Sequence, residues 1–349
     1  MKNLLRETRL SKGLKTREIA QKLGVDQALV SKFENGQRLP TRKQIQDLIS
    51  ILSLNEAETM SLWLKEKVMQ EIGGDYAYIP QIVSLVAEDY ARYYINPKIE
   101  ISADLNAILN KIDAYKAELD AKRVSDSFRI AQALETEYTF ESNRIEGNTL
   151  TLRETDLVIN EGLTIAGKSM REHLEALNHH EAIVYVKELA QNRTQINERE
   201  ILTIHNLILR GIYPEDAGKY RKVQVMISGS QHQPPSPFRV KEEMEQFMSW
   251  FSSHKLSLHP VLLAAEVHER LVTIHPFVDG NGRTSRLMMN LILLQNGYVI
   301  ANLKGDNASR MSYYKALEDA QTKQSKVAFY LLVSQTELDC LQRYIQILG

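Results

Sequence analysis

The sequence predicts an all-α protein, and three observations support this fold class. Glycine and proline are scarce, at 16 and 9 of 349 residues, which disfavours a turn-rich all-β fold. Apolar residues recur at helical spacing in several long segments. Shorter periodic stretches end at glycines, where a helix can stop in a left-handed conformation. The length indicates two or three domains of about 100–200 residues each.

Composition limits the class of protein further. Hydrophobic residues make up 43% of the chain and charged residues 25%, which is typical of a globular protein. The single cysteine excludes a disulfide framework and a zinc site built from cysteines. The N-terminus lacks an apolar signal core, and no apolar run reaches the ~20 residues needed to span a bilayer. We therefore expect a cytoplasmic protein with no membrane partner.

Charge is distributed unevenly along the chain. Residues 1–43 carry eleven Lys and Arg against four acids, a net charge of +7, which leaves −8 for residues 44–349. This asymmetry is typical of a nucleic-acid-binding module joined to a larger body. The overall net charge of −1 therefore does not exclude a nucleic-acid partner.

The basic segment contains two short helices separated by a glycine. Residues 17–23 are amphipathic, Thr16 precedes them as an N-cap, and Gly24 ends the helix. Asp26 caps a second helix over residues 27–35. Two short helices across a glycine turn predict a helix-turn-helix. Residues 1–65 resemble the lambda-repressor-like (XRE-type) family, and we place this domain at residues 1–66.

The resemblance implies that the helix over residues 27–35 enters the major groove of DNA. It implies base contacts from the exposed face of this helix and phosphate contacts nearby, from Gln27, Ala28, Ser31, Lys32 and Arg38. DNA binding of this kind usually requires a dimer, so we expect a homodimer. A helix-turn-helix used only to dock a protein or to dimerise is the alternative.

Residues 67–126 are predicted to be a helical connector. Residues 73–75, Gly-Gly-Asp, are the best candidate for a linker. We expect a helix over residues 79–94 and a longer one over residues 103–122, where apolar residues recur at helical spacing. No pattern in this segment indicates chemistry.

The residues that indicate chemistry lie at positions 275–286, HPFVDGNGRTSR. An apolar-periodic helix over residues 262–274 must end near Pro276, because proline biases the preceding residue away from the helix. A second helix starts near Arg283 and ends at Gly297. The loop between them lies at a helix N-terminus, and its two glycines let successive N–H groups point at one anion.

The side chains around this loop suit phosphoryl or nucleotidyl transfer. Arg283 and Arg286 share one helical face and can bind phosphate oxygens. Asp279 offers an oxygen ligand to Mg²⁺, which normally arrives with a nucleotide. His275 is the residue type that takes a proton from a hydroxyl near neutral pH.

The string resembles the Fic family motif, HPFx(D/E)GNGRxxR, at all nine specified positions. The resemblance implies transfer of AMP from ATP to a Ser, Thr or Tyr hydroxyl of a protein, with pyrophosphate leaving. It implies that His275 is the general base and that Asp279 holds Mg²⁺. The residues implied to bind the ATP phosphates are Gly280, Asn281, Gly282, Arg283 and Arg286. A kinase-like branch of the family carries lysine in place of the second glycine, so Gly282 favours AMP transfer.

Two further segments resemble parts of this family. Residues 219–227 alternate enough for a short strand, and with a turn and a return arm they predict a small β-hairpin. It resembles the Fic flap, which pairs with an extended segment of the target. The flap residues implied to bind the target are Val223, Val225, Ile227 and Gly229, and a purely structural hairpin is the alternative. Downstream, the segment that borders adenine in the family corresponds to Tyr313, Tyr314 and Gln321, although a tyrosine pair is equally typical of a core.

Residues 142–148, SNRIEGN, match the inhibitory motif of the family, (S/T)xxxE(G/N), at Ser142, Glu146 and Gly147. They lie at the end of a helix predicted over residues 127–144. The resemblance implies that Glu146 pairs with Arg286, whose guanidinium cannot also serve the γ-phosphate. We therefore expect an enzyme that is autoinhibited at rest. Relatives with this glutamate can also remove AMP from a target, so the net direction stays open.

Together these patterns predict an autoinhibited protein adenylyltransferase that uses ATP and Mg²⁺. Its Fic domain is expected over residues 127–335, followed by a terminal helix over residues 336–349. The alternative is a DNA-binding transcriptional regulator whose Fic domain senses nucleotide or modifies the protein itself.

Overall fold

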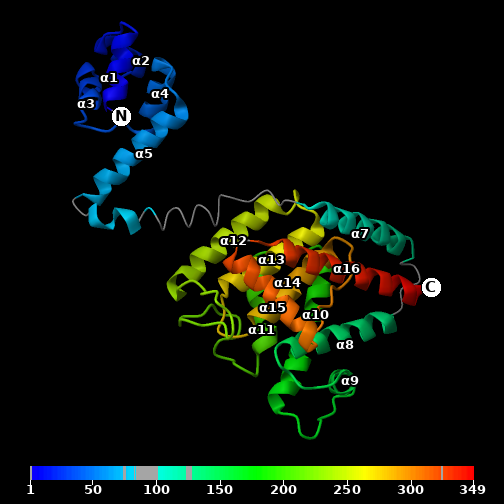
Figure 1. Cartoon of the computed structure of the whole chain (residues 1–349). Helices are drawn as coiled ribbons and strands as arrows, with labels where there is room; N and C mark the ends of the chain where they lie inside the picture. The colour runs from blue at the N-terminus through cyan, green and yellow to red at the C-terminus, as the bar shows by residue number, and fades with distance from the viewer. Residues whose placement is uncertain (1, 74–75, 82, 84–100, 123–127, 324) are drawn as a thin grey trace. The chain divides into compact units, whose positions relative to one another are not determined.

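The computed structural model describes residues 2–73, 76–81, 83, 101–122, 128–323 and 325–349 (Figure 1). The chain divides into two compact units, Met1–Pro97 and Lys98–Gly349, which are described separately below. The regular elements in the described ranges are helices, so the all-α prediction is confirmed for this part of the chain.

The first unit is a helical bundle whose turns largely follow the predicted capping residues. Gly24 ends a helix with a φ of +65°, and the Asp26 side chain accepts a hydrogen bond from the backbone of Ala28 at 2.7 Å. The prediction that Thr16 is an N-cap is wrong, because Lys15 takes that position and its N–H donates to Glu18 at 2.6 Å. The helices are α1 (Lys2–Ser11), α2 (Thr16–Leu23), α3 (Gln27–Glu34), α4 (Arg42–Leu52), α5 (Glu56–Ile72) and the short η1 (Tyr76–Tyr78).

One apolar cluster holds the first unit together. It includes Ile19 of α2, Phe33 of α3 and Ile45 of α4, all fully buried. A buried ion pair also joins α1 to α3, because the Arg9 guanidinium donates to both oxygens of the Glu34 carboxylate, at 2.6 and 2.9 Å. These contacts fix the orientation of α3, the helix predicted to meet DNA.

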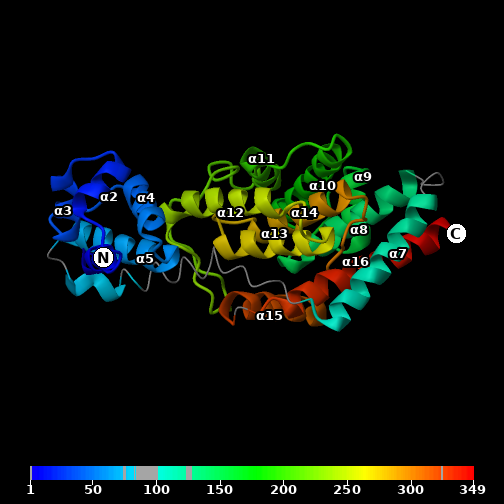
Figure 2. The same ribbon diagram turned by 90° about the horizontal axis from the view of Figure 1, so that it is seen from above.

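The second unit is a larger bundle built around α14 (Asn281–Gln295). Helices α13 (Pro260–Ile274), α10 (Met170–Gln191) and α11 (Glu198–Leu209) pack directly on α14, as does α8 (Phe128–Ile145). Figure 2 shows α7 (Ala103–Lys122) lying along α16 (Val327–Leu348) at one side of this unit. The remaining helices are α9 (Leu152–Asn160), η3 (Pro237–Arg239), α12 (Val240–His254) and α15 (Asn307–Thr322).

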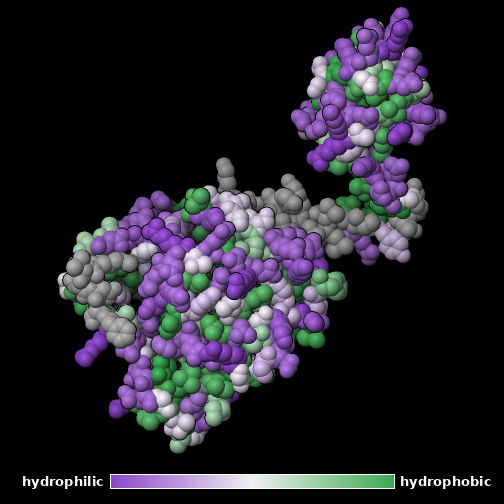
Figure 3. All heavy atoms as spheres, turned by 180° about the vertical axis from the view of Figure 1, so that it is seen from behind, coloured by the Kyte–Doolittle hydropathy of each residue, from purple (hydrophilic) through white to green (hydrophobic). Residues whose placement is uncertain are grey.

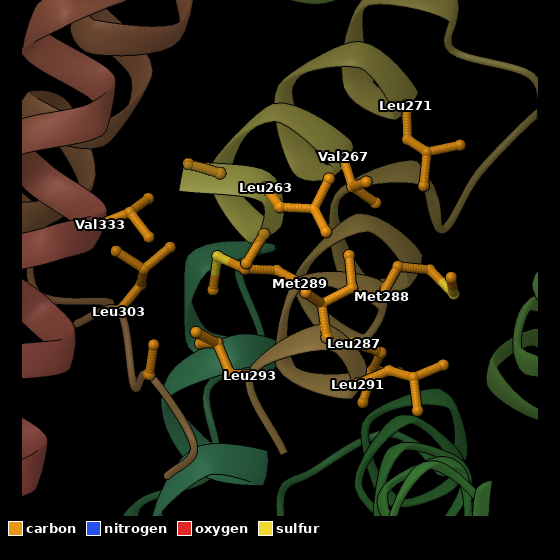
Figure 4. Close-up of a cluster of buried hydrophobic side chains, with 14 of the residues drawn as sticks. Leu263, Val267, Leu271, Leu287, Met288, Met289, Leu291, Leu293, Leu303 and Val333 are labelled. Carbon is orange, nitrogen blue, oxygen red and sulfur yellow. The ribbon is translucent and has the colours of Figure 1, made fainter. Parts of the chain in front are cut away.

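Helix α14 is buried on nearly all sides. Figure 4 shows that Met288 and Met289 of α14 meet Leu263 and Val267 of α13. Leu293 extends from α14 in another direction, toward Leu303 in the segment that precedes α15. A helix enclosed in this way is held rigidly by close packing, so its first turn is a stable platform for a functional loop.

Several helix boundaries differ slightly from the predicted ones. Helix α7 matches the prediction over residues 103–122, whereas α14 begins at Asn281 because Gly280 is its N-cap, with a φ of +77°. Helix α16 begins at Val327 and runs without a break past residue 335, where we placed the end of the Fic domain. The linker expected at residues 73–75 and the helix expected over residues 79–94 lie largely outside the described residues.

The predicted β-hairpin over residues 219–235 is wrong for the described chain, which forms no strand there. The turn exists, since the Ser230 N–H donates to the Ile227 carbonyl at 3.1 Å. Instead of a ladder, the Arg221 side chain joins the two arms through the carbonyls of Val223 and Pro235, at 3.1 and 2.5 Å. Two successive prolines in the return arm have no N–H to donate, which explains why a ladder does not form.

The surface agrees with a globular protein. In the space-filling view, the face of the second unit that is visible is mostly hydrophilic, with small hydrophobic patches (Figure 3). Among the helices of the described residues, none has the length and apolar character needed to cross a membrane.

Candidate active site

The motif loop connects the end of α13 to the start of α14. His275 takes the left-handed conformation with a φ of +51°, which turns the chain out of α13. The Asn281 side chain then accepts from the Phe277 N–H at 3.0 Å and donates to the Phe277 carbonyl at 2.9 Å. This pair of bonds closes the loop on itself. The first N–H groups of α14 therefore point into one small region beside the loop.

His275 is neutral at pH 7, and its two ring nitrogens differ in what they can do. Burial lowers its pKa to about 4, against the opposing effects of the Val272 carbonyl and the Glu146 carboxylate. Its Nδ1 lies 3.2 Å from the Val272 carbonyl oxygen, which can only accept, so Nδ1 carries the ring proton. The lone pair is therefore on Nε2, which is the arrangement that a general base needs.

Arg283 and Arg286 form a buried cationic patch on the first turns of α14. Both side chains are almost fully buried. Nε of Arg283 and Nη1 of Arg286 have no hydrogen-bond partner among the described residues. Nη1 of Arg283 also makes no hydrogen bond there, but it lies 3.5 Å from Oε1 of Glu175 as an ion pair. Unpaired buried N–H groups are costly, so this patch has the chemistry to bind an anion.

Glu146 occupies part of this patch. Its Oε1 accepts from Nη2 of Arg286 at 2.7 Å. A methyl group added to Gly282 would lie 2.4 Å from the same oxygen, so the carboxylate rests directly against the start of α14. Burial alone would lower the pKa of Arg286, but the charge and hydrogen bond of Glu146, together with Tyr313 and Tyr138, raise it above its ordinary value.

The chain around Glu146 is held by both neighbouring helices. Ser142 binds Arg286 twice, through its hydroxyl oxygen at 3.0 Å and its carbonyl oxygen at 2.9 Å. Gly147 has a φ of +95°, which lets the chain leave α8 in a sharp turn. The next residue, Asn148, donates to the Glu175 carboxylate of α10 at 3.0 Å.

Asp279 is engaged by cations and by the backbone. Its Oδ1 accepts from the Gly280 N–H at 2.6 Å and lies 3.5 Å from Nη2 of Arg283. Its Oδ2 accepts from Nη2 of Arg171 at 3.1 Å. No group of three or more His, Cys, Asp or Glu in the described ranges is arranged to hold a metal ion, so Asp279 is a lone carboxylate here.

The predicted adenine residues lie around the same loop. Tyr313 is buried and its hydroxyl lies 3.0 Å from Nε2 of His268. Tyr314 is partly exposed and donates to the carbonyl of Ile145, next to Glu146, at 3.0 Å. Gln321 donates to the Thr273 hydroxyl at 3.2 Å, two residues before His275.

Three residues of the site were missed by the sequence reasoning. His205 of α11 stacks on Phe277 with ring centroids 3.6 Å apart, and its Nε2 lies 3.0 Å from the Asp279 carbonyl oxygen. Arg221 donates from Nε to the His275 carbonyl at 2.8 Å, and Arg171 binds Asp279. Each lies 50 or more positions from its partner and carries no local motif, so only the folded chain reveals it.

The predicted DNA-binding residues lie together on the first unit. Gln27, Ala28, Ser31 and Lys32 are exposed on one face of α3, and Arg38 is exposed after it. The Gln27 amide nitrogen donates to the Thr16 hydroxyl at 3.0 Å, which orients this side chain at the start of α3. An oriented amide next to an exposed lysine is suited to reading a base edge beside a phosphate.

Two segments of the chain match known domain families. Residues 195–293 match the Fic/DOC family, and residues 3–62 match a helix-turn-helix domain. The structure also resembles a Fic-domain-containing signaling protein from Bacteroides thetaiotaomicron, with a TM-score of 0.63 and 25% sequence identity. That likeness covers 69% of this chain and 96% of the other.

Curated relatives are similar to part of this chain. A protein adenylyltransferase Fic from Nematostella vectensis is 38% identical over 218 residues, which is 61% of this chain and 50% of the relative. The protein of the same name from Drosophila willistoni is 34% identical over 234 residues, which is 66% of this chain and 47% of the relative. The chain therefore spans about half the length of the curated relatives it matches.

Proposed function

Because the chain carries a Fic/DOC domain and an N-terminal helix-turn-helix domain, we propose that it transfers AMP from ATP to a Ser, Thr or Tyr hydroxyl of a protein. The observation that carries this proposal is a neutral His275 in the same motif as a buried arginine patch, where Nε of Arg283 and Nη1 of Arg286 have no hydrogen-bond partner among the described residues. A base beside an anion-binding patch is what transfer from a nucleotide to a hydroxyl requires. The name shared by the two curated relatives agrees with this chemistry.

In the proposed reaction, Nε2 of His275 takes the proton of the target hydroxyl while its oxygen bonds to the α-phosphorus of ATP. The bond from the α-phosphorus to the oxygen bridging to the β-phosphate breaks, and pyrophosphate leaves. The backbone N–H groups at Gly280, Asn281 and Gly282 bind phosphate oxygens at the N-terminus of α14. Nε of Arg283 and Nη1 of Arg286, which make no hydrogen bond to any described residue, bind the charge carried by the leaving pyrophosphate.

Asp279 fits a divalent cation, because a carboxylate oxygen is the kind of ligand that Mg²⁺ prefers. Its position at the mouth of the phosphate loop and its partly exposed side chain support this role. When bound there, Mg²⁺ would neutralise phosphate charge during transfer.

We propose further that Glu146 inhibits the resting enzyme by competing with ATP for Arg286. The carboxylate uses Nη2 of Arg286 and covers the backbone at Gly282, two of the groups that a phosphate would need. A Cβ on Gly282 would lie 2.4 Å from Oε1 of Glu146 and 3.0 Å from Nη1 of Arg286, so the carboxylate lies where a phosphate on Nη1 would have to fit. Two anions cannot share this space on one guanidinium, so ATP and Glu146 exclude each other. Removal of AMP by the same site is tested by incubating the enzyme with a protein that already carries AMP and measuring release of AMP.

The remaining predicted contacts complete the proposal. Tyr314 and Gln321 border the adenine in this proposal. Tyr314 contacts Ile145, the residue before Glu146, and Gln321 contacts Thr273, two residues before His275. The exposed loop with Val223, Val225, Ile227 and Gly229 binds an extended segment of the target. Its arms form no ladder with each other in the described chain, which favours pairing with an outside strand. The carbonyls of Val223, Val225 and Ile227 accept bonds from within the loop, so such a strand would have to replace these bonds or use other backbone groups.

Incubation of the Glu146→Gly variant with ATP and a lysate tests the proposed reaction. Two labelled substrates are used in parallel, one with the label on the α-phosphate and one on the γ-phosphate. We expect protein labelled from the α-phosphate only. We expect no label from a double variant that combines Glu146→Gly with His275→Ala. Label from the γ-phosphate would instead indicate phosphate transfer, and binding of ATP with no label at all would contradict an enzyme.

A DNA-binding regulator is the second candidate function, because Lys32 of α3 and Arg38 after it are exposed cations in a segment with an excess of positive charge, which suits contact with a phosphate backbone. In this case self-modification would alter DNA binding. Selection of bound fragments from random DNA by the full chain, with and without ATP, tests it. A bound sequence whose affinity changes after self-labelling supports the regulatory function, and equal affinity for all fragments contradicts it.

A further inference from the structure

Arg171 stands out because it occupies the carboxylate that we assign to a cation. It lies in the first turn of α10, and Nη2 donates to Oδ2 of Asp279 at 3.1 Å. The other oxygen of this carboxylate is already taken, by the Gly280 N–H at 2.6 Å. Oδ1 also lies 3.5 Å from Nη2 of Arg283, a buried cation, so Oδ2 is the oxygen more open to an incoming cation, and Arg171 holds it.

Arg171 is fixed in this position by three further contacts. Its Nε donates to Oε1 of Glu175 at 3.0 Å, and its Nη1 donates to the Tyr213 hydroxyl at 2.8 Å. The guanidinium also lies over the Tyr213 ring, 5.2 Å from the centroid. An arginine with all three nitrogens engaged is an ordered part of the site, even though its side chain is 49% exposed.

A guanidinium and Mg²⁺ cannot share Oδ2 comfortably. Mg²⁺ binds carboxylate oxygens at about 2.0–2.1 Å, which leaves no room for an arginine N–H on the same lone pairs and the same side. Both groups are also positive, so they repel each other at such short range. Because Arg171 is half exposed, it can leave Asp279 for water without disrupting the core.

We propose that Arg171 is an electrostatic clamp on Asp279 that must be displaced before a divalent cation binds. This regulatory role rests on the proposed function, since it takes Asp279 to be the cation ligand. The clamp acts on the cation, whereas Glu146 acts on the phosphates, so the resting site is closed at two separate points. The two points share an anchor, because Glu175 binds both Arg171 and Asn148, the second residue after Glu146.

The clamp can be tested by metal binding to the intact chain, without nucleotide and without catalysis. Mn²⁺ is the probe, and the loss of its free-ion electron paramagnetic resonance signal gives the dissociation constant. The variant is Arg171→Gln, which removes the charge and retains much of the side-chain length. Arg210→Gln is the matched control. Arg210 follows α11, its side chain is 46% exposed, close to the 49% of Arg171, and it pairs with Glu181 of α10 instead of Asp279.

We expect Arg171→Gln to tighten Mn²⁺ binding about tenfold, which is the order of magnitude for removing a like charge next to a partly exposed ligand. Arg171→Lys keeps the charge and should stay near wild type, as should Arg210→Gln. Tyr213→Leu removes one anchor and should give a smaller gain of about threefold. This last variant keeps the test valid if Arg171→Gln does not fold.

Equal Mn²⁺ affinity in wild type and Arg171→Gln would overturn the clamp, as would weaker binding, since Arg171 would then support the ligand. A gain as large in Arg171→Lys as in Arg171→Gln would show that charge is not the cause. Asp279→Asn separates the two proposals. If Asp279→Asn abolishes Mn²⁺ binding, Asp279 is a cation ligand, whatever the effect of Arg171→Gln. If Asp279→Asn leaves Mn²⁺ binding unchanged, the proposed role of Asp279 as a cation ligand is wrong, and the clamp is wrong with it.

Discussion

The contact between Glu146 and Arg286 leads to a graded prediction for two variants. Glu146→Gln keeps the shape of the side chain and removes its charge, whereas Glu146→Gly removes the whole contact. The bond measures 2.7 Å, and the Arg286 side chain is 1% exposed while that of Glu146 is 32% exposed. A charge-assisted hydrogen bond of this kind contributes roughly 1.5–3 kcal/mol, and a neutral one about half as much.

These free energies predict labelling rates, because Glu146 and ATP compete for Arg286. If ATP binds productively only when Glu146 leaves Arg286, the loss of the whole bond should raise the rate roughly 10- to 150-fold, at 1.36 kcal/mol for each factor of ten. Glutamine keeps about half of the bond, so Glu146→Gln should raise the rate only about 4- to 13-fold. The expected order is therefore glycine, glutamine, wild type.

The assay is the initial rate of labelling from α-labelled ATP at a concentration below saturation. Glu137→Gln is a suitable control, because Glu137 lies on α8, the helix that leads into Glu146. It is also paired with cations, but with Lys304 and Arg343 instead of Arg286. Its rate should equal that of the wild type. A glutamine variant as slow as the wild type beside a fast glycine variant would refute the reasoning, since the charge of the carboxylate would then not be the brake.

Three other predictions follow from the same contacts. Because burial lowers the pKa of His275 to about 4, the labelling rate should be flat from pH 6 to 8 and fall about tenfold per unit only below that pKa, and a midpoint near 6.5 would contradict this. Arg9→Met should destabilise the first unit by about 3–5 kcal/mol, because it leaves the buried Glu34 carboxylate without its cation, and adding Glu34→Leu should recover most of that loss in a urea titration followed by tryptophan fluorescence. Lys32→Ala should weaken DNA binding to all sequences and reduce the salt dependence by about one ion, whereas Gln27→Ala should mainly relax base preference in a competition assay.

Local sequence signals predicted the parts of the structure that local forces determine. Gly24 and Asp26 define a helix stop and a helix start through their own backbone and side chain, so they could be recognised without the fold. The short motif at residues 275–286 likewise contains its own turn, because the Asn281 side chain closes the loop on Phe277. Such contacts join residues only a few positions apart.

The errors arose where distant residues decide the structure. The alternation at residues 219–227 suggested a strand, but the Arg221 side chain binds one carbonyl of its own arm, at Val223, and one of the opposite arm, at Pro235. The prolines of the return arm have no N–H to donate to a ladder. The contact between Arg171 and Asp279 joins residues 108 positions apart and has no counterpart in either local sequence. Helix period and capping carry no information about such pairs.

The backbone of His275 has a consequence for how related sequences can diverge. A residue with a side chain and a φ of +51° costs about 1–2 kcal/mol, a cost that glycine avoids and asparagine reduces. The fold alone would therefore be more stable with glycine or asparagine at this position, and only the chemistry of the imidazole favours histidine. A related protein that had lost catalysis but still bound nucleotide would become more stable by replacing histidine at this position with glycine or asparagine. Glycine or asparagine at position 275 beside an intact phosphate loop is thus the mark by which a descendant retained only for binding could be recognised.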